Sequence, residues 1–135
     1  MGNGLKLYLA GRMRGVQFYN FPAFDRARDE LRALGYDPVS PADMDRETGF
    51  DGTLVSPADP CDKIPEGFDF DACVMRVTAA ILKADGVCLI DLFWHESKGA
   101  AAELGIARWR GKRIFRLHHV PSSGHPYLIE DTGGR

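Results

Sequence analysis

ADGVCLIDLFWHESKGAAAELGIA, residues 84–107, is the stretch that determines the predicted fold of this chain. Residues 86–90 are a short apolar run, as in a strand that is buried on both faces. A polar and aromatic loop follows over residues 91–96. Ser97 is a suitable N-cap for an alanine-rich helix that begins near residue 98. The segment therefore predicts a strand, a loop and a helix in succession.

Glu103 lies within the first two turns of that helix and is the main candidate for a catalytic residue. Its neighbours three and four positions away are all small or apolar: Gly99, Ala100, Ile106 and Ala107. A carboxylate on such a stripe is costly to bury unless it has a role, and the helix N-terminus should favour its ionised form. An ionised glutamate can act as a nucleophile or stabilise an oxocarbenium ion. A solvated helix glutamate is the alternative.

The remaining sequence alternates between strand and helix patterns. Strands are expected at residues 5–10, 36–40 and 113–118, and helices at 21–34, 70–83 and 98–109, with a helical turn at 43–47. This alternation predicts an α/β fold, a three-layer Rossmann- or flavodoxin-like sandwich whose mostly parallel sheet has four to five strands.

We expect one domain over residues 1–120, followed by a C-terminal tail over 121–135 with a short segment at 127–129 and loose final residues. Residues 41–68 form a long loop, rich in proline and glycine. A loop of this length is usually functional or mobile, and a tolerated surface insertion is the alternative.

Composition narrows the class of partner. The net charge is about −2, so the chain has no general attraction to nucleic acid or to an anionic membrane, and no apolar run is long enough to span a bilayer. The three cysteines form no C-x-x-C pair, which favours a reducing cytoplasm. The histidines lack partners at metal-ligand spacing, so we expect neither a metal nor a cofactor.

The carboxyl ends of parallel strands meet at one edge of a sheet, where ligands bind. The turn after the first strand holds Gly11, Arg12, Arg14 and Gly15. It is neither G-x-G-x-x-G nor a P-loop, but two arginines between glycines suit an anion such as phosphate. Solvated turn arginines are the alternative.

Other candidates fall at the same edge. Ser97 and Gly99 at a helix N-terminus suit an anion, although Ser97 is equally explained as an N-cap. Tyr8 faces the side of its strand opposite Leu7 and Leu9, and either reaches Glu103 or belongs to the core. Trp94 either stacks on a base or covers the end of the sheet.

Four motifs together resemble the nucleoside 2-deoxyribosyltransferase-like superfamily, and in particular an uncharacterised branch found in phages and bacteria. They are YLAGRMRG at residues 8–15, NFPAF at 20–24, SPADMD at 40–45 and WHESKGAAAE at 94–103. The resemblance covers most of residues 5–118 and implies cleavage of an N-glycosidic bond by Glu103, with Tyr8 orienting its carboxylate. Ser97, six residues before Glu103, matches the serine that binds the 5′-phosphate in nucleoside 5′-monophosphate N-glycosidases.

The position at the carboxyl edge of the sheet and the resemblance together predict ten substrate-binding residues: Gly11, Arg12, Arg14, Gly15, Asn20, Asp43, Asp91, Trp94, Ser97 and Gly99. Of these, the resemblance itself matches Arg14, Gly15 and Ser97. It also implies a homodimer or a higher homo-oligomer, in which Ser122 and Ser123 could complete a neighbour's site. The chain departs from the pattern at one point. An aspartate expected near residues 76–77 is replaced by Arg76 or Val77, with Asp71 as a possible substitute.

The sequence thus predicts hydrolysis or transfer at the N-glycosidic bond of a (deoxy)ribonucleoside 5′-monophosphate. A non-catalytic module that binds or sequesters nucleotides is the main alternative. A phosphoribohydrolase of the lysine-decarboxylase-like type ranks lower, because residues 97–103 lack its glycine pair. Cleavage of NAD is also conceivable. The base, the sugar and the acceptor are not indicated by the sequence.

Overall fold

The computed structural model describes residues 2–132, and the expected loose end at 133–135 lies outside them. The strands are β1 (Lys6–Ala10), β2 (Asp37–Val39), β3 (Gly86–Leu89), β4 (Arg113–His119) and β5 (Pro126–Asp131). The helices are α1 (Phe21–Ala33), α2 (Pro41–Glu47), α3 (Phe70–Lys83) and α4 (Lys98–Trp109). No helix of the described residues is both long enough and apolar enough to cross a membrane.

The chain is an α/β protein with a mostly parallel sheet, as the alternating pattern predicts. The strand order is β2-β1-β3-β4-β5, in which β1 to β4 are parallel and β5 is antiparallel to β4. The chain turns from β2 on one side of β1 to β3 on the other, so the strand order reverses at the β1–β3 pair. In open parallel sheets such a reversal marks the crevice for ligands.

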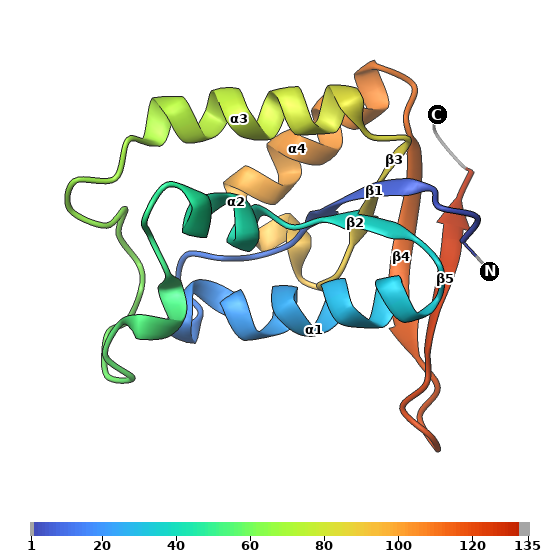
Figure 1. Cartoon of the computed structure of the whole chain (residues 1–135), viewed down its shortest axis with the longest axis horizontal. Coiled ribbons are helices and arrows are strands. Elements are labelled where there is room, and N and C mark those ends of the chain that lie inside the picture. Colours follow the sequence, from blue (N-terminus) through green and yellow to red (C-terminus); the bar gives the residue numbers. More distant parts are fainter. Residues whose placement is uncertain (1, 133–135) are drawn as a thin grey trace.

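Alternating side chains of β1 divide the core into two parts. Leu7 and Leu9 pack with Phe24 and Leu31 of α1 on one face of the sheet. On the other face, Tyr8 belongs to the cluster that holds buried residues of α3 and α4. Figure 1 shows α1 on one side of the sheet and α3 and α4 on the other. Tyr8 therefore faces the helix that carries Glu103.

Two elements differ from expectation. The expected turn at residues 43–47 is the full helix α2, which begins at Pro41 because the Ser40 hydroxyl caps it by accepting from the Ala42 N–H at 3.2 Å. The expected short segment at 127–129 is the six-residue strand β5, which lies in the sheet rather than in a tail. The β5 strand is an edge strand with no fully buried residue, so its hydrophobic pattern is weak.

Candidate active site

A cavity of about 690 Å³ opens where the first βα turn meets the start of α4. Its walls come from three parts of the chain: the turn after β1, the segment from α2 to α3, and the first turns of α4. From the predicted site, the cavity is lined by Gly11, Arg14, Gly15, Ser97, Gly99 and Glu103. These residues come from segments that are distant in sequence, as the argument from the carboxyl edge of the sheet predicts.

Glu103 lines the cavity, and Tyr8 supports it from the core. The Tyr8 hydroxyl donates a hydrogen bond to Oε2 of Glu103, and Tyr8 is completely buried. Tyr8 is therefore both a core residue and a partner of the carboxylate, which joins the two alternatives that its sequence position left open. One oxygen of Glu103 is fixed by this contact, so the side chain is held in one orientation.

Burial controls the charge of Glu103. Burial is the main cause that raises the pKa of Glu103 to about 7, and the negative charge of Asp45 acts in the same direction. The hydrogen bond from Tyr8 acts in the opposite direction and lowers the pKa. The net effect therefore favours the neutral form, whereas the helix N-terminus alone was expected to favour the ionised form. Glu103 is the sixth residue of α4, and the effect of the helix dipole fades within the first turn.

The start of α4 combines a capped helix end with two cations. The Ser97 hydroxyl accepts a hydrogen bond from the Ala100 N–H at 3.1 Å, as expected of an N-cap. Lys98 and Arg14 also line the cavity, and neither makes an ion pair with any residue between 2 and 132. Arg14 lies over the ring of Phe70, with 5.4 Å between its guanidinium carbon and the ring centroid. An anion would find compensating charge here.

Three predicted binding residues shape the turn instead of lining the cavity. The Arg12 Nε lies 2.5 Å from Oδ2 of Asp91, which joins the first βα turn to the loop before α4. Asn20 donates from Nδ2 to the carbonyl oxygen of Arg12 at 2.8 Å. Trp94 is also a predicted binding residue that does not line the cavity. It packs against the core on the α3–α4 face. Their contacts are structural.

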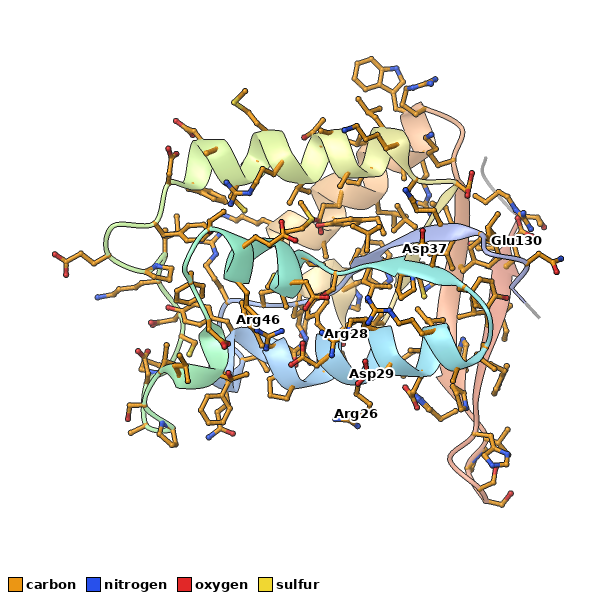
Figure 2. The ribbon with its side chains drawn as sticks, in the orientation of Figure 1. Arg26, Arg28, Asp29, Asp37, Arg46 and Glu130 are labelled. Carbon is orange, nitrogen blue, oxygen red and sulfur yellow. The ribbon has the colours of Figure 1, made fainter. Side chains whose placement is uncertain are left out.

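Asp43 is not brought to the cavity. Its Oδ1 accepts from Arg28 at 2.7 Å and from Arg46 at 3.2 Å. Figure 2 shows Arg28 and Arg46 between α1 and α2, where both also contact Asp25. Residues two apart on a helix point in different directions, and it is Asp45, two positions later, that lines the cavity.

Asp45 is a cavity residue that was not predicted from the sequence, and it is only 7% exposed. The nearest cationic atom is Nη2 of Arg76, 3.9 Å from Oδ1, and the Cys73 thiol lies 4.0 Å from the same oxygen. Burial raises the pKa of Asp45 to about 6, although the positive charge of Arg76 acts to lower it. The signal was present in the sequence: Pro41 and Ala42, four and three positions earlier, are apolar, as around Glu103.

The aspartate that the resemblance leads us to expect falls at Arg76 or Val77. Arg76 faces Asp45, so a cation on α3 is paired with a carboxylate on α2, and Val77 lines the cavity. Asp71 is exposed and does not line the cavity. Ser122 and Ser123 lie in the connection between β4 and β5, and within this single chain they are also absent from the lining.

Aromatic side chains form another wall of the cavity. The ring of Phe50 makes edge contacts with Tyr19, Phe21 and Phe68, with centroid distances of 5.4, 5.8 and 5.7 Å. All four line the cavity. Phe50 and Phe68 belong to the loop expected over residues 41–68, which therefore contributes to the site rather than being a plain surface insertion.

The fold and the site define an α/β domain whose cavity is lined by four carboxylates, Asp45, Asp62, Glu96 and Glu103, and by two cations, Arg14 and Lys98, that make no ion pair within residues 2–132. Residues 5–116 match the model of a family described as a domain of unknown function, DUF4406, and the chain belongs to that family. No curated protein matches the chain. A crystal structure of a conserved protein from Enterococcus faecalis V583 is similar at 18% identity and a TM-score of 0.47. The similarity covers 87% of this chain, which spans 65% of that protein.

Proposed function

We propose that this protein cleaves the N-glycosidic bond of a (deoxy)ribonucleoside 5′-monophosphate, with Glu103 as the nucleophile. The observation that carries the proposal is the contact between Glu103 and the buried Tyr8 hydroxyl, at the wall of a cavity shared with Arg14 and Ser97. A fixed carboxylate that faces a cavity is the group a retaining glycosidase uses to attack the anomeric carbon.

The cations support the choice of a phosphorylated substrate. Arg14 and Lys98 supply positive charge in the same cavity, and the first N–H groups of α4 add hydrogen-bond donors beside Ser97. The aromatic wall around Phe50 offers a surface on which a base can stack. Water or a second base then releases the sugar from Glu103, which makes the reaction a hydrolysis or a transfer.

The test is base release from a panel of ribo- and deoxyribonucleoside 5′-monophosphates, followed by chromatography with wild type and Glu103→Gln. Glu47→Gln is the matched control, because Glu47 is an exposed acid at the end of α2 and does not line the cavity. We expect release by wild type and the control and loss of at least about a hundredfold in Glu103→Gln. Release that survives in Glu103→Gln would remove the proposed nucleophile.

A non-catalytic nucleotide-binding module is the second candidate. Arg76 in place of the aspartate of the resemblance favours it, because a cation there alters the contacts expected at the sugar. Calorimetric titration with the same nucleotides distinguishes the two. Binding without base release after prolonged incubation would favour the module, whereas turnover would exclude it.

Three further proposals complete this assignment. The fold is a three-layer Rossmann- or flavodoxin-like sandwich, and the protein acts in the cytoplasm without a cofactor. It is a homodimer or a higher homo-oligomer, formed through the apolar outer sides of α3 and α4. The exposed apolar and small residues of this outer α3–α4 surface that do not line the cavity are Met75, Ala79, Leu82, Ala101, Gly105 and Trp109.

A further inference from the structure

We infer that Asp45 is the acid that protonates the departing base, so that it and Glu103 form a catalytic carboxylate pair. This inference rests on the proposed function. Its starting observation is geometric. Asp45 is more than nine-tenths buried and lines the cavity, yet no nitrogen or oxygen donor of residues 2–132 makes a hydrogen bond to its carboxyl group.

A buried carboxyl group whose only donor among residues 2–132 is a thiol is unusual, because a thiol is a weak donor and a stronger hydrogen bond would recover stability. Its oxygens have only two distant neighbours, Nη2 of Arg76 at 3.9 Å and the Cys73 thiol at 4.0 Å. By contrast, the Glu103 carboxylate is fixed by Tyr8. One acid of the cavity is therefore held for attack, while the other is left available to a ligand.

The groups around Asp45 allow it to carry a proton. Arg76 and Cys73 face it from α3, and its charge acts on Glu103 of α4 and on Tyr8 of β1. Burial raises the pKa of both carboxyl groups, to about 6 for Asp45 and about 7 for Glu103. Two interacting acids with such values hold about one proton between them near pH 6.5, mostly on Glu103, and the reactive form is the minor one in which the proton lies on Asp45.

The proton balance is that of a retaining glycosidase. An oxygen of Glu103 bonds to C1′ as the bond from C1′ to the base nitrogen breaks, and that nitrogen takes the electron pair of the bond. The proton of Asp45 passes to another acceptor atom of the base, N7 in a purine, so that the base leaves as a neutral molecule. Water then adds to C1′, the bond to Glu103 breaks, and the carboxylate of Glu103 recovers its electron pair. The proton lost by the water returns to Asp45. The sum is hydrolysis, with both acids restored.

The experiment compares Asp45→Asn with wild type on two nucleotides that differ in their need for an acid. A neutral purine 5′-monophosphate requires protonation of its base, whereas the N7-methylated form carries a base that leaves without it. If wild type accepts pyrimidines only, a uracil nucleotide and its 5-fluoro derivative form the pair. We expect Asp45→Asn to lose at least about a hundredfold in kcat on the neutral base and less than about tenfold on the activated one.

The pH profile gives a second readout. Removal of the acid should abolish the alkaline limb of kcat/KM and leave the acid limb, which belongs to ionisation of Glu103. Activity of Asp45→Asn on the activated nucleotide shows that the variant is folded, and Glu47→Gln should behave as wild type on both substrates.

The outcomes separate the inference from the function. Equal losses on the two nucleotides would overturn the acid role of Asp45 and leave the glycosidase proposal standing. Unchanged activity on the neutral base would do the same. If wild type released no base from either nucleotide, both the glycosidase proposal and the role of Asp45 would be overturned.

Discussion

At the scale of the residue, the Glu103 carboxyl group should make the protein less stable at alkaline pH. Its pKa in the folded protein is about 7, against an ordinary value of 4.5. The folded state therefore binds more protons than the unfolded state between those values, and the free energy of unfolding falls as pH rises through that window. Above pH 7 this contribution to stability is lost completely, which lowers the free energy of unfolding by at most about 3.4 kcal/mol.

Glu103→Gln removes this charge while keeping an oxygen that can accept from Tyr8. We expect the variant to be more stable than wild type at pH 8, by on the order of 1–3 kcal/mol, and to match it near pH 4. Urea denaturation at the two pH values measures the difference, with Glu47→Gln as the reference. If Glu103→Gln were equally destabilised at both pH values, burial of the Glu103 charge would not be the cause of the pH-dependent loss of stability.

The same scale shows which side chains the sequence predicts well. Glu103 has small and apolar neighbours, and the side chains of β1 alternate between the faces of the sheet. These two features were enough to predict that Glu103 and Tyr8 lie on the same face, where the structure places them in contact. The choice between Asp43 and Asp45 was not available from the motif alone. It depends on which side of α2 faces the cavity, and Arg28 and Arg46 of the neighbouring ion pairs hold Asp43 on the other.

At the scale of the element, the N-terminus of α4 should decide between phosphorylated and unphosphorylated substrates. Ser97→Asp keeps an N-cap, because aspartate caps a helix as well as serine does, and the negative charge suits the helix end. The same charge repels a 5′-phosphate near Arg14 and Lys98. We expect stability to stay within about 1 kcal/mol and the monophosphate to lose at least about tenfold in kcat/KM relative to the nucleoside.

Kinetics with matched pairs of nucleoside and nucleoside 5′-monophosphate measure this change. Ser97→Ala is the companion variant, since it removes the cap without adding charge. A fall in both substrates by the same factor in Ser97→Asp would mean that the start of α4 does not contact the phosphate.

The element scale also explains what the sequence did not predict. Strands buried on both faces, such as β3, have a continuous apolar pattern and were found with bounds close to those observed. The β5 strand lies at the edge of the sheet and exposes alternate residues. Its side chains contact those of β4 in cross-strand pairs, such as Arg113 with Glu130 and His118 with Tyr127. Such pairs become visible only once the partner strand is known.

At the scale of the whole molecule, the sequence predicts the sheet and the edge at which the cavity opens, because both follow from the strand and helix alternation. It does not predict the aromatic wall. Phe50 and Phe68 come from a stretch with no regular period, and their contacts with Tyr19 and Phe21 depend on how the loop folds back over α1. Tertiary packing, rather than local pattern, therefore shapes the half of the cavity that would hold the base.

The outer α3–α4 surface makes a prediction about assembly. Met75 is 73% exposed and Trp109 is 88% exposed. On α4, Ala101, Gly105 and Trp109 follow one another at four-residue spacing, so small residues there allow another helix to approach closely. A second copy could pack on this surface without burying a charge on that stripe, and a stable contact would bury about 800 Å² from each partner.

Sedimentation equilibrium should therefore find a dimer or a larger assembly for the wild type. Met75→Glu places a charge in the contact and should shift the protein to the monomer, with a rise in Kd of at least about tenfold. Leu54→Glu is the matched control, because Leu54 is 82% exposed on the short turn at Gly52–Leu54, away from both helices. A wild type that sediments as a monomer at about 100 μM would contradict the proposed assembly, since a standard-sized interface gives micromolar affinity or better.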